Sequence, residues 1–116
     1  MEKEFIVQLS PELFSVKTTI EAELQNGNKT NEKIYSLILK AIEFLKEKRT
    51  GLPISKKLPI YKYYEKKYGI TNLFMIKLAY GSRGFYTLVS GGQLKVLQII
   101  LEVEETHKGY EKKGNY

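Results

Sequence analysis

Residues 73–105 read LFMIKLAYGSRGFYTLVSGGQLKVLQIILEVEE, and this stretch decides the fold of the chain. It contains three apolar runs, at residues 73–80, 85–90 and 94–105, separated by short segments that contain glycine. Apolar runs of this length, bounded by glycine, are typical of strands joined by hairpin connections. The stretch therefore predicts three consecutive antiparallel strands, a β-meander.

Two helices are predicted upstream of the meander. Ser10-Pro11-Glu12 is typical of a helix start, because serine caps, proline fits the first helical position and glutamate complements the helix dipole. We expect this helix to end near Gln25, and a second helix, after an Asn/Gly turn, to end at Gly51 and Pro53. The second helix is indicated by an apolar stripe with helical spacing: Ile34, Leu37, Ile38, Ala41, Ile42 and Leu45.

Two further elements complete the expected fold. Alternating apolar residues at Glu4–Leu9 (EFIVQL) predict a short strand, and Pro59–Tyr68 (PIYKYYEKKY), followed by Gly69, predicts a third helix. We expect a single α+β domain over residues 1–116: an N-terminal strand, an α-helical hairpin, then the three-strand antiparallel meander, with a short basic C-terminal tail from about residue 109. The natural packing places the helices on one face of a four-stranded antiparallel sheet.

The composition excludes several classes of function. The 116 residues include no cysteine and one histidine, which excludes disulfides, thiol nucleophiles and zinc or iron sites built from cysteine or histidine clusters. We expect neither a metal nor a cofactor. No apolar stretch reaches the roughly 20 residues that span a bilayer, and the start, Met1-Glu2-Lys3-Glu4, lacks the order of a signal peptide. We therefore expect a soluble cytoplasmic protein without a membrane partner.

The positive charge lies in the second part of the chain. Residues 1–50 carry eight Lys and Arg against eight Glu, whereas residues 51–116 carry eleven against five and eight of the nine tyrosines. Basic side chains mixed with flat aromatic rings favour binding of unpaired nucleic acid; the alternative is a solvated lysine surface over half-buried tyrosines. The expected nucleic-acid contacts are Lys56, Lys57, Lys62, Lys66, Lys67 and Lys108.

Three short motifs carry a resemblance to a known family. They are the strand LFMIKL with Lys77, the segment Ser82-Arg83-Gly84-Phe85-Tyr86 with its pattern of arginine, two variable residues and tyrosine, and His107-Lys108-Gly109-Tyr110 after the last strand. With these motifs, about residues 69–110 resemble the RelE/ParE superfamily of toxin–antitoxin toxins. Many members of that superfamily are ribosome-dependent mRNA endonucleases.

The resemblance implies a RelE-like fold and cleavage of mRNA by attack of the 2′-OH on the adjacent phosphate. Such cleavage without a metal requires a base for the 2′-OH proton, cations for the charge on the phosphorane and an acid for the departing 5′-oxygen. The resemblance assigns the cationic role to Lys77 and Arg83, and proton transfer to Tyr110 or His107. It also implies mRNA on the ribosome and an antitoxin protein as partners, with a homodimer as a further expectation.

Two positions that are usually basic in the family differ in this chain. They are occupied by Met75 and Glu104, an apolar and an anionic side chain. Other functions therefore stay open at this point: a non-catalytic basic module that binds nucleic acid, a family member with another target such as gyrase, or a homodimeric structural protein.

Overall fold

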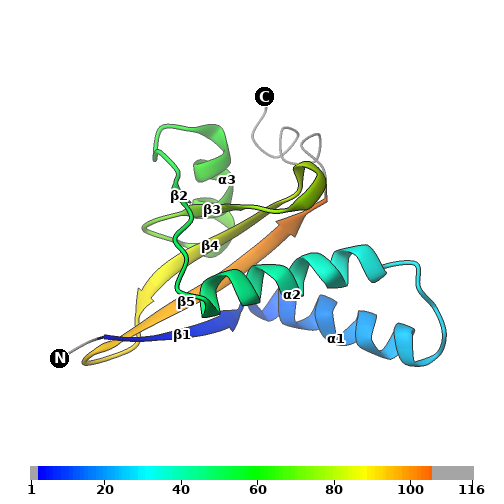
Figure 1. Ribbon diagram of the computed structural model, residues 1–116. Coiled ribbons are helices and arrows are strands. Elements are labelled where there is room, and N and C mark those ends of the chain that lie inside the picture. The colour runs from blue at the N-terminus through cyan, green and yellow to red at the C-terminus, as the bar shows by residue number, and fades with distance from the viewer. Residues whose placement is uncertain (1–2, 106–116) are drawn as a thin grey trace.

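A five-stranded sheet organises the chain, with helices on both of its faces (Figure 1). The computed structural model describes residues 3–105. In chain order the elements are β1 (Glu4–Leu9), α1 (Pro11–Gln25), α2 (Glu32–Lys46), β2 (Leu52–Pro53), α3 (Pro59–Tyr68), β3 (Phe74–Lys77), a tight turn (Ala79–Gly81), β4 (Arg83–Ser90) and β5 (Lys95–Glu104). The strand order across the sheet is β1-β5-β4-β3-β2.

The predicted meander is present, but the sheet that contains it is mixed. β3, β4 and β5 pair antiparallel in sequence order, as expected. β1 pairs parallel with β5, from Glu4 opposite Lys95 to Leu9 opposite Ile100, and the two-residue β2 pairs with β3. The prediction of a four-stranded, fully antiparallel sheet is therefore wrong. The parallel pair arises because the helical hairpin and the other strands, rather than a tight turn, connect β1 to β5.

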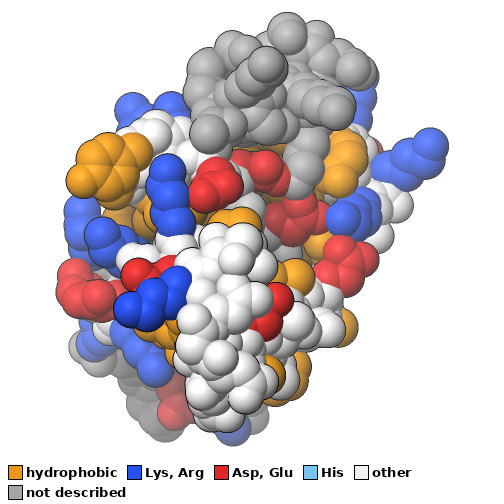
Figure 2. All heavy atoms as spheres, turned by 90° about the vertical axis from the view of Figure 1, so that its right-hand side faces the viewer, with side chains coloured by type: hydrophobic (Ala, Val, Ile, Leu, Met, Phe, Trp, Pro, Cys, Tyr) orange, Lys and Arg blue, Asp and Glu red, His pale blue; other side chains and the backbone are white. Residues whose placement is uncertain are grey.

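α2 follows its apolar stripe but ends earlier than expected. The buried residues of the helix are Leu37, Ile38, Ala41 and Leu45. Its outer side is charged, and Figure 2 shows basic and acidic side chains intermixed at the end of the molecule where α1 turns into α2. The helix ends at Lys46, and Lys48 adopts a left-handed conformation with φ 63°, so the predicted end at Gly51 and Pro53 is too late. None of the helices within residues 3–105 is long and apolar enough to cross a membrane.

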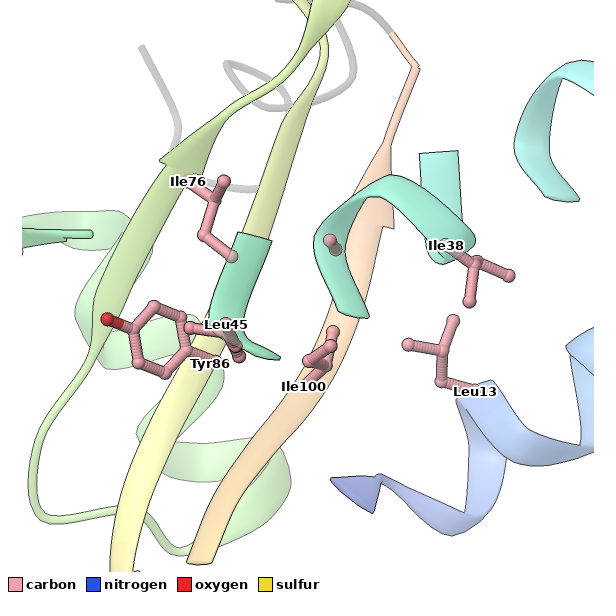
Figure 3. Close-up of a cluster of buried hydrophobic side chains, with 7 residues drawn as sticks. Leu13, Ile38, Leu45, Ile76, Tyr86 and Ile100 are labelled. Atoms are coloured by element: carbon pink, nitrogen blue, oxygen red, sulfur yellow. The ribbon is translucent and has the colours of Figure 1, made fainter. Parts of the chain in front are cut away.

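The apolar core is divided between the two faces of the sheet. Successive strand residues point to opposite faces, so Tyr86 joins the cluster under α1 and α2, while Phe85 joins the cluster under α3. The expectation that all helices pack on one face is therefore wrong, because β4 and β5 carry apolar side chains on both sides. Figure 3 shows the first cluster, with Leu13, Ile38, Leu45, Ile76, Tyr86 and Ile100.

Gly51 lies at a point where no side chain fits. A Cβ atom there would stand 2.7 Å from the carbonyl oxygen of Met75 and 2.8 Å from Cε1 of Tyr86. Because the strand backbone cannot move away cheaply, we expect Gly51→Ala to lower the free energy of unfolding by about 1–3 kcal/mol, measured by urea denaturation. The control is Gly84→Ala, whose Cβ would meet its nearest neighbour, Cδ1 of Leu78, at 3.6 Å. Equal stability of the two variants would contradict this packing.

Candidate nucleic-acid interface

The two cations predicted to stabilise charge lie side by side at one end of the sheet. Lys77, the last residue of β3, is directly opposite Arg83, the first residue of β4. Both side chains belong to the α3 face, because Met75 and Phe85, two residues away along the strands, pack in the cluster under α3. Lys77 is exposed and Arg83 is half-buried. The fold thus places two cations at opposed positions of adjacent strands, on one face of the sheet.

The connection between β3 and β4 fixes this pair to the sheet. Ser82 is fully buried, and its hydroxyl donates a hydrogen bond of 2.7 Å to the carbonyl of Glu105. The Ser82 N–H donates to the carbonyl of Ala79 at 3.1 Å, and the Ser82 carbonyl accepts from the N–H of Leu78 at 2.9 Å. Nη1 of Arg83 also donates to the Ser82 carbonyl, at 3.2 Å. The guanidinium is therefore anchored close to the backbone of its own hairpin.

Two glutamates of β5 share the face with the cation pair. Glu104 is opposite Arg83, and Glu102 lies two residues earlier on the strand. Glu102 accepts hydrogen bonds from Nζ of Lys67 at 2.8 Å and from the hydroxyl of Tyr68 at 2.7 Å. The bond to Glu102 raises the pKa of Lys67, and burial together with the same carboxylate raises the pKa of Tyr68. This end of the sheet therefore combines cations with carboxylates.

The lysines predicted to bind nucleic acid have different surroundings. Lys67 forms ion pairs with Glu102 at 2.8 Å and with Glu12 at 3.1 Å, so much of its charge is balanced within the protein. Four other predicted lysines are also exposed, before α3 or within it: Lys56, Lys57, Lys62 and Lys66. His107, Lys108 and Tyr110 lie outside the described residues. The fold thus pairs Lys77 with Arg83 across two strands, while Lys56, Lys57, Lys62 and Lys66 belong to α3 and the segment before it.

Among the tyrosines of residues 51–105, all but Tyr80 pack in or against the apolar clusters. Tyr61 and Tyr64 of α3 are 1% and 0% exposed, and the Tyr64 ring lies 5.0 Å from that of Phe85. Burial raises the pKa of Tyr64. These rings therefore pack the helix onto the sheet and are not accessible to a base. Tyr80, in the turn between β3 and β4, is 90% exposed and was not singled out from the sequence.

A second basic surface lies on the opposite face of the sheet. A groove of about 940 Å³ runs between the start of β1 and the C-terminal end of α2. Its apolar lining includes Val7, Phe74 and Leu88. The basic side chains that line it are Lys3, Lys46, Lys48 and Arg49. Sequence reasoning missed this surface because residues 1–50 are neutral when their charges are summed. Lys46, Lys48 and Arg49 are close together in the sequence, and the fold adds Lys3 to them.

No metal site accompanies these surfaces in the part of the chain that the structure describes: no group of three or more His, Cys, Asp or Glu side chains is placed to hold an ion. Comparison of the chain with protein-family models, curated proteins and solved structures gives no significant match. The function is therefore inferred from the residues of the chain itself.

Proposed function

We propose that this protein is a RelE-like toxin: a cytoplasmic, metal-free mRNA endonuclease that acts on the ribosome and is neutralised by an antitoxin protein. The observation that supports the proposal is the pairing of Lys77 with Arg83 across β3 and β4. Two cations on adjacent strands of one sheet face suit a phosphate whose charge increases during the reaction.

In the proposed reaction, the 2′-oxygen of one nucleotide attacks the adjacent phosphorus atom and the bond to the 5′-oxygen breaks. The 2′-OH proton passes to a base, and an acid supplies a proton to the departing 5′-oxygen. Lys77 and Arg83 stabilise the negative charge on the phosphorane. Tyr110 or His107, beyond the described residues, is assigned to proton transfer by the resemblance of its motif.

A second candidate function is a non-catalytic module that binds single-stranded RNA. The observation that favours it is the position of Glu104 opposite Arg83, with Glu102 nearby on the same face. A carboxylate beside the cations weakens the binding of a phosphorane dianion more than that of a singly charged phosphodiester. The two candidates share the RNA-binding surface and differ in whether the RNA is cleaved.

Both candidates predict RNA binding that depends on salt through Lys77 and Arg83. For single-stranded RNA, each lost phosphate contact reduces the slope of log K against log salt concentration by about 0.7. Because the pair is proposed to hold one phosphate, we expect the double variant Lys77→Gln/Arg83→Gln to bind a short oligouridylate more weakly than wild type, with a slope reduced by about 0.7. A salt titration of binding, followed by fluorescence anisotropy, measures both quantities.

The control for this experiment is Lys95→Gln. Lys95 is an exposed lysine at the start of β5, at the opposite end of β4 from Arg83. The Lys95→Gln variant should leave the slope of log K against log salt concentration close to that of wild type. Negligible binding by the wild-type protein at low salt, or binding that salt does not weaken, would exclude both candidate functions.

A further inference from the structure

Tyr80 occupies a backbone position that ordinarily selects against a large side chain. The N–H of Ser82 bonds to the carbonyl of Ala79, which makes Tyr80 and Gly81 the central residues of the turn. Their φ angles are 58° and 77°, and two central residues with positive φ define a type I′ turn. Asn, Asp and Gly are preferred at the first of these positions, and a bulky residue there is an outlier.

Packing does not explain the presence of tyrosine in this turn. The Tyr80 side chain is 90% exposed, more than any other large apolar side chain in the described residues. Leu94, which also has a positive φ of 62°, is 41% exposed and lies in the β4–β5 connection. Strained residues that persist without a gain in packing are found preferentially at functional sites. The ring at position 80 is therefore expected to contact something outside the chain.

A lysine lies beside the Tyr80 ring. Nζ of Lys33, in the first turn of α2, lies 6.0 Å from the centre of the Tyr80 ring. Lys77 and Arg83 are each three residues from Tyr80 along the chain, on the strands that the turn joins. A flat, solvent-exposed ring with one lysine beside it, in the turn that joins the strands of Lys77 and Arg83, has the chemistry that recognises a base next to a bound phosphate in a single strand.

We infer that Tyr80 is a stacking platform for an unpaired RNA base, presented by the turn that joins β3 and β4, the strands that carry the Lys77–Arg83 pair. This inference rests on the proposed function, because it assigns a base contact to the strand whose phosphate that pair binds. Tyr80 is a positioning residue in this scheme: it holds the RNA in register on the sheet without touching the reacting phosphate.

The test compares three variants at position 80 for binding of a short oligouridylate at low salt. Tyr80→Leu and Tyr80→Asn are expected to weaken binding about tenfold, which is within the range for loss of one base–aromatic contact, whereas Tyr80→Phe keeps the ring and should bind like wild type. An oligonucleotide of the same length made of abasic residues should bind all four proteins equally. Leu94→Asn, which changes the positive-φ residue of the β4–β5 connection in the same way, is the control and should leave affinity unchanged.

Thermal unfolding separates stacking from a structural role. Because asparagine suits the first position of a type I′ turn, Tyr80→Asn should be at least as stable as wild type while binding RNA more weakly. The inference is overturned if Tyr80→Leu and Tyr80→Asn bind the oligouridylate as tightly as wild type, or if their loss of affinity is equal for the abasic strand. In either case the salt-dependent binding of wild type still supports the proposed function. Absence of wild-type binding at low salt would exclude both the proposed function and the inference about Tyr80.

Discussion

Arg83→Ala is expected to slow cleavage of translated mRNA by roughly tenfold or more, because it removes one of the two cations proposed to stabilise the phosphorane. Primer extension on mRNA from a translating extract measures the cleavage. The variant should remain folded, since Arg83 lies at the first position of β4 and outside both apolar clusters. Arg83→Lys retains the charge but not the planar guanidinium, so it should recover part of the activity.

Glu104, whose carboxylate lies opposite Arg83, provides a second variant for the same cleavage assay. Glu104→Arg places a cation where the resembled family usually has one, and it should raise the cleavage rate if the site is catalytic but weakened by its carboxylates. Lys95→Ala, at the far end of the sheet, is the control for nonspecific loss of charge. If wild type and Glu104→Arg both leave translated mRNA intact while still binding RNA, the endonuclease is excluded and the binding module takes its place.

The elements that the sequence predicts correctly are those encoded by neighbouring residues. The stripe of α2 and the bounds of α3 between Pro59 and Gly69 depend on spacing over a few turns, and both agree with the structure. The parallel pairing of β1 with β5 depends on residues at opposite ends of the chain, and no local pattern specifies it. The sequence does contain a signal that helices cover both faces of the sheet, because the consecutive apolar residues Phe85 and Tyr86 point to opposite sides of β4.

In the candidate site, too, some features follow from neighbouring residues and others from residues far apart in the chain. Lys77 and Arg83 flank a short hairpin, so their proximity follows from sequence. Lys67 forms ion pairs with Glu12 of α1 and Glu102 of β5. Only the tertiary fold brings these two carboxylates to the end of α3. The basic groove near α2 and the strained conformation of Tyr80 likewise depend on the folded backbone, which composition does not report.

The largest loss of stability is expected from Phe85→Ala, at about 3–5 kcal/mol in the free energy of unfolding. Phe85 is 0% exposed and lies under α3, with its ring 5.0 Å from that of Tyr64. Its removal takes away apolar contact area and leaves a cavity between α3 and the sheet. Urea denaturation measures the loss. Phe5→Ala is the matched control, because the Phe5 side chain is 52% exposed on the edge strand β1 and its truncation should cost about 1 kcal/mol or less.

The division of the core between two faces predicts where the Phe85→Ala protein loosens first. α3 packs on the sheet through the cluster that contains Phe85, whereas α1 and α2 pack on the other face through Tyr86 and its neighbours. In native-state hydrogen exchange, the amides of α3 should therefore lose more protection than those of α2. Equal loss in both helices would mean that the two clusters unfold as one unit. Selective loss in α3 would mean that the helix carrying Lys62 and Lys66 can detach while the strands that hold Lys77 and Arg83 stay paired.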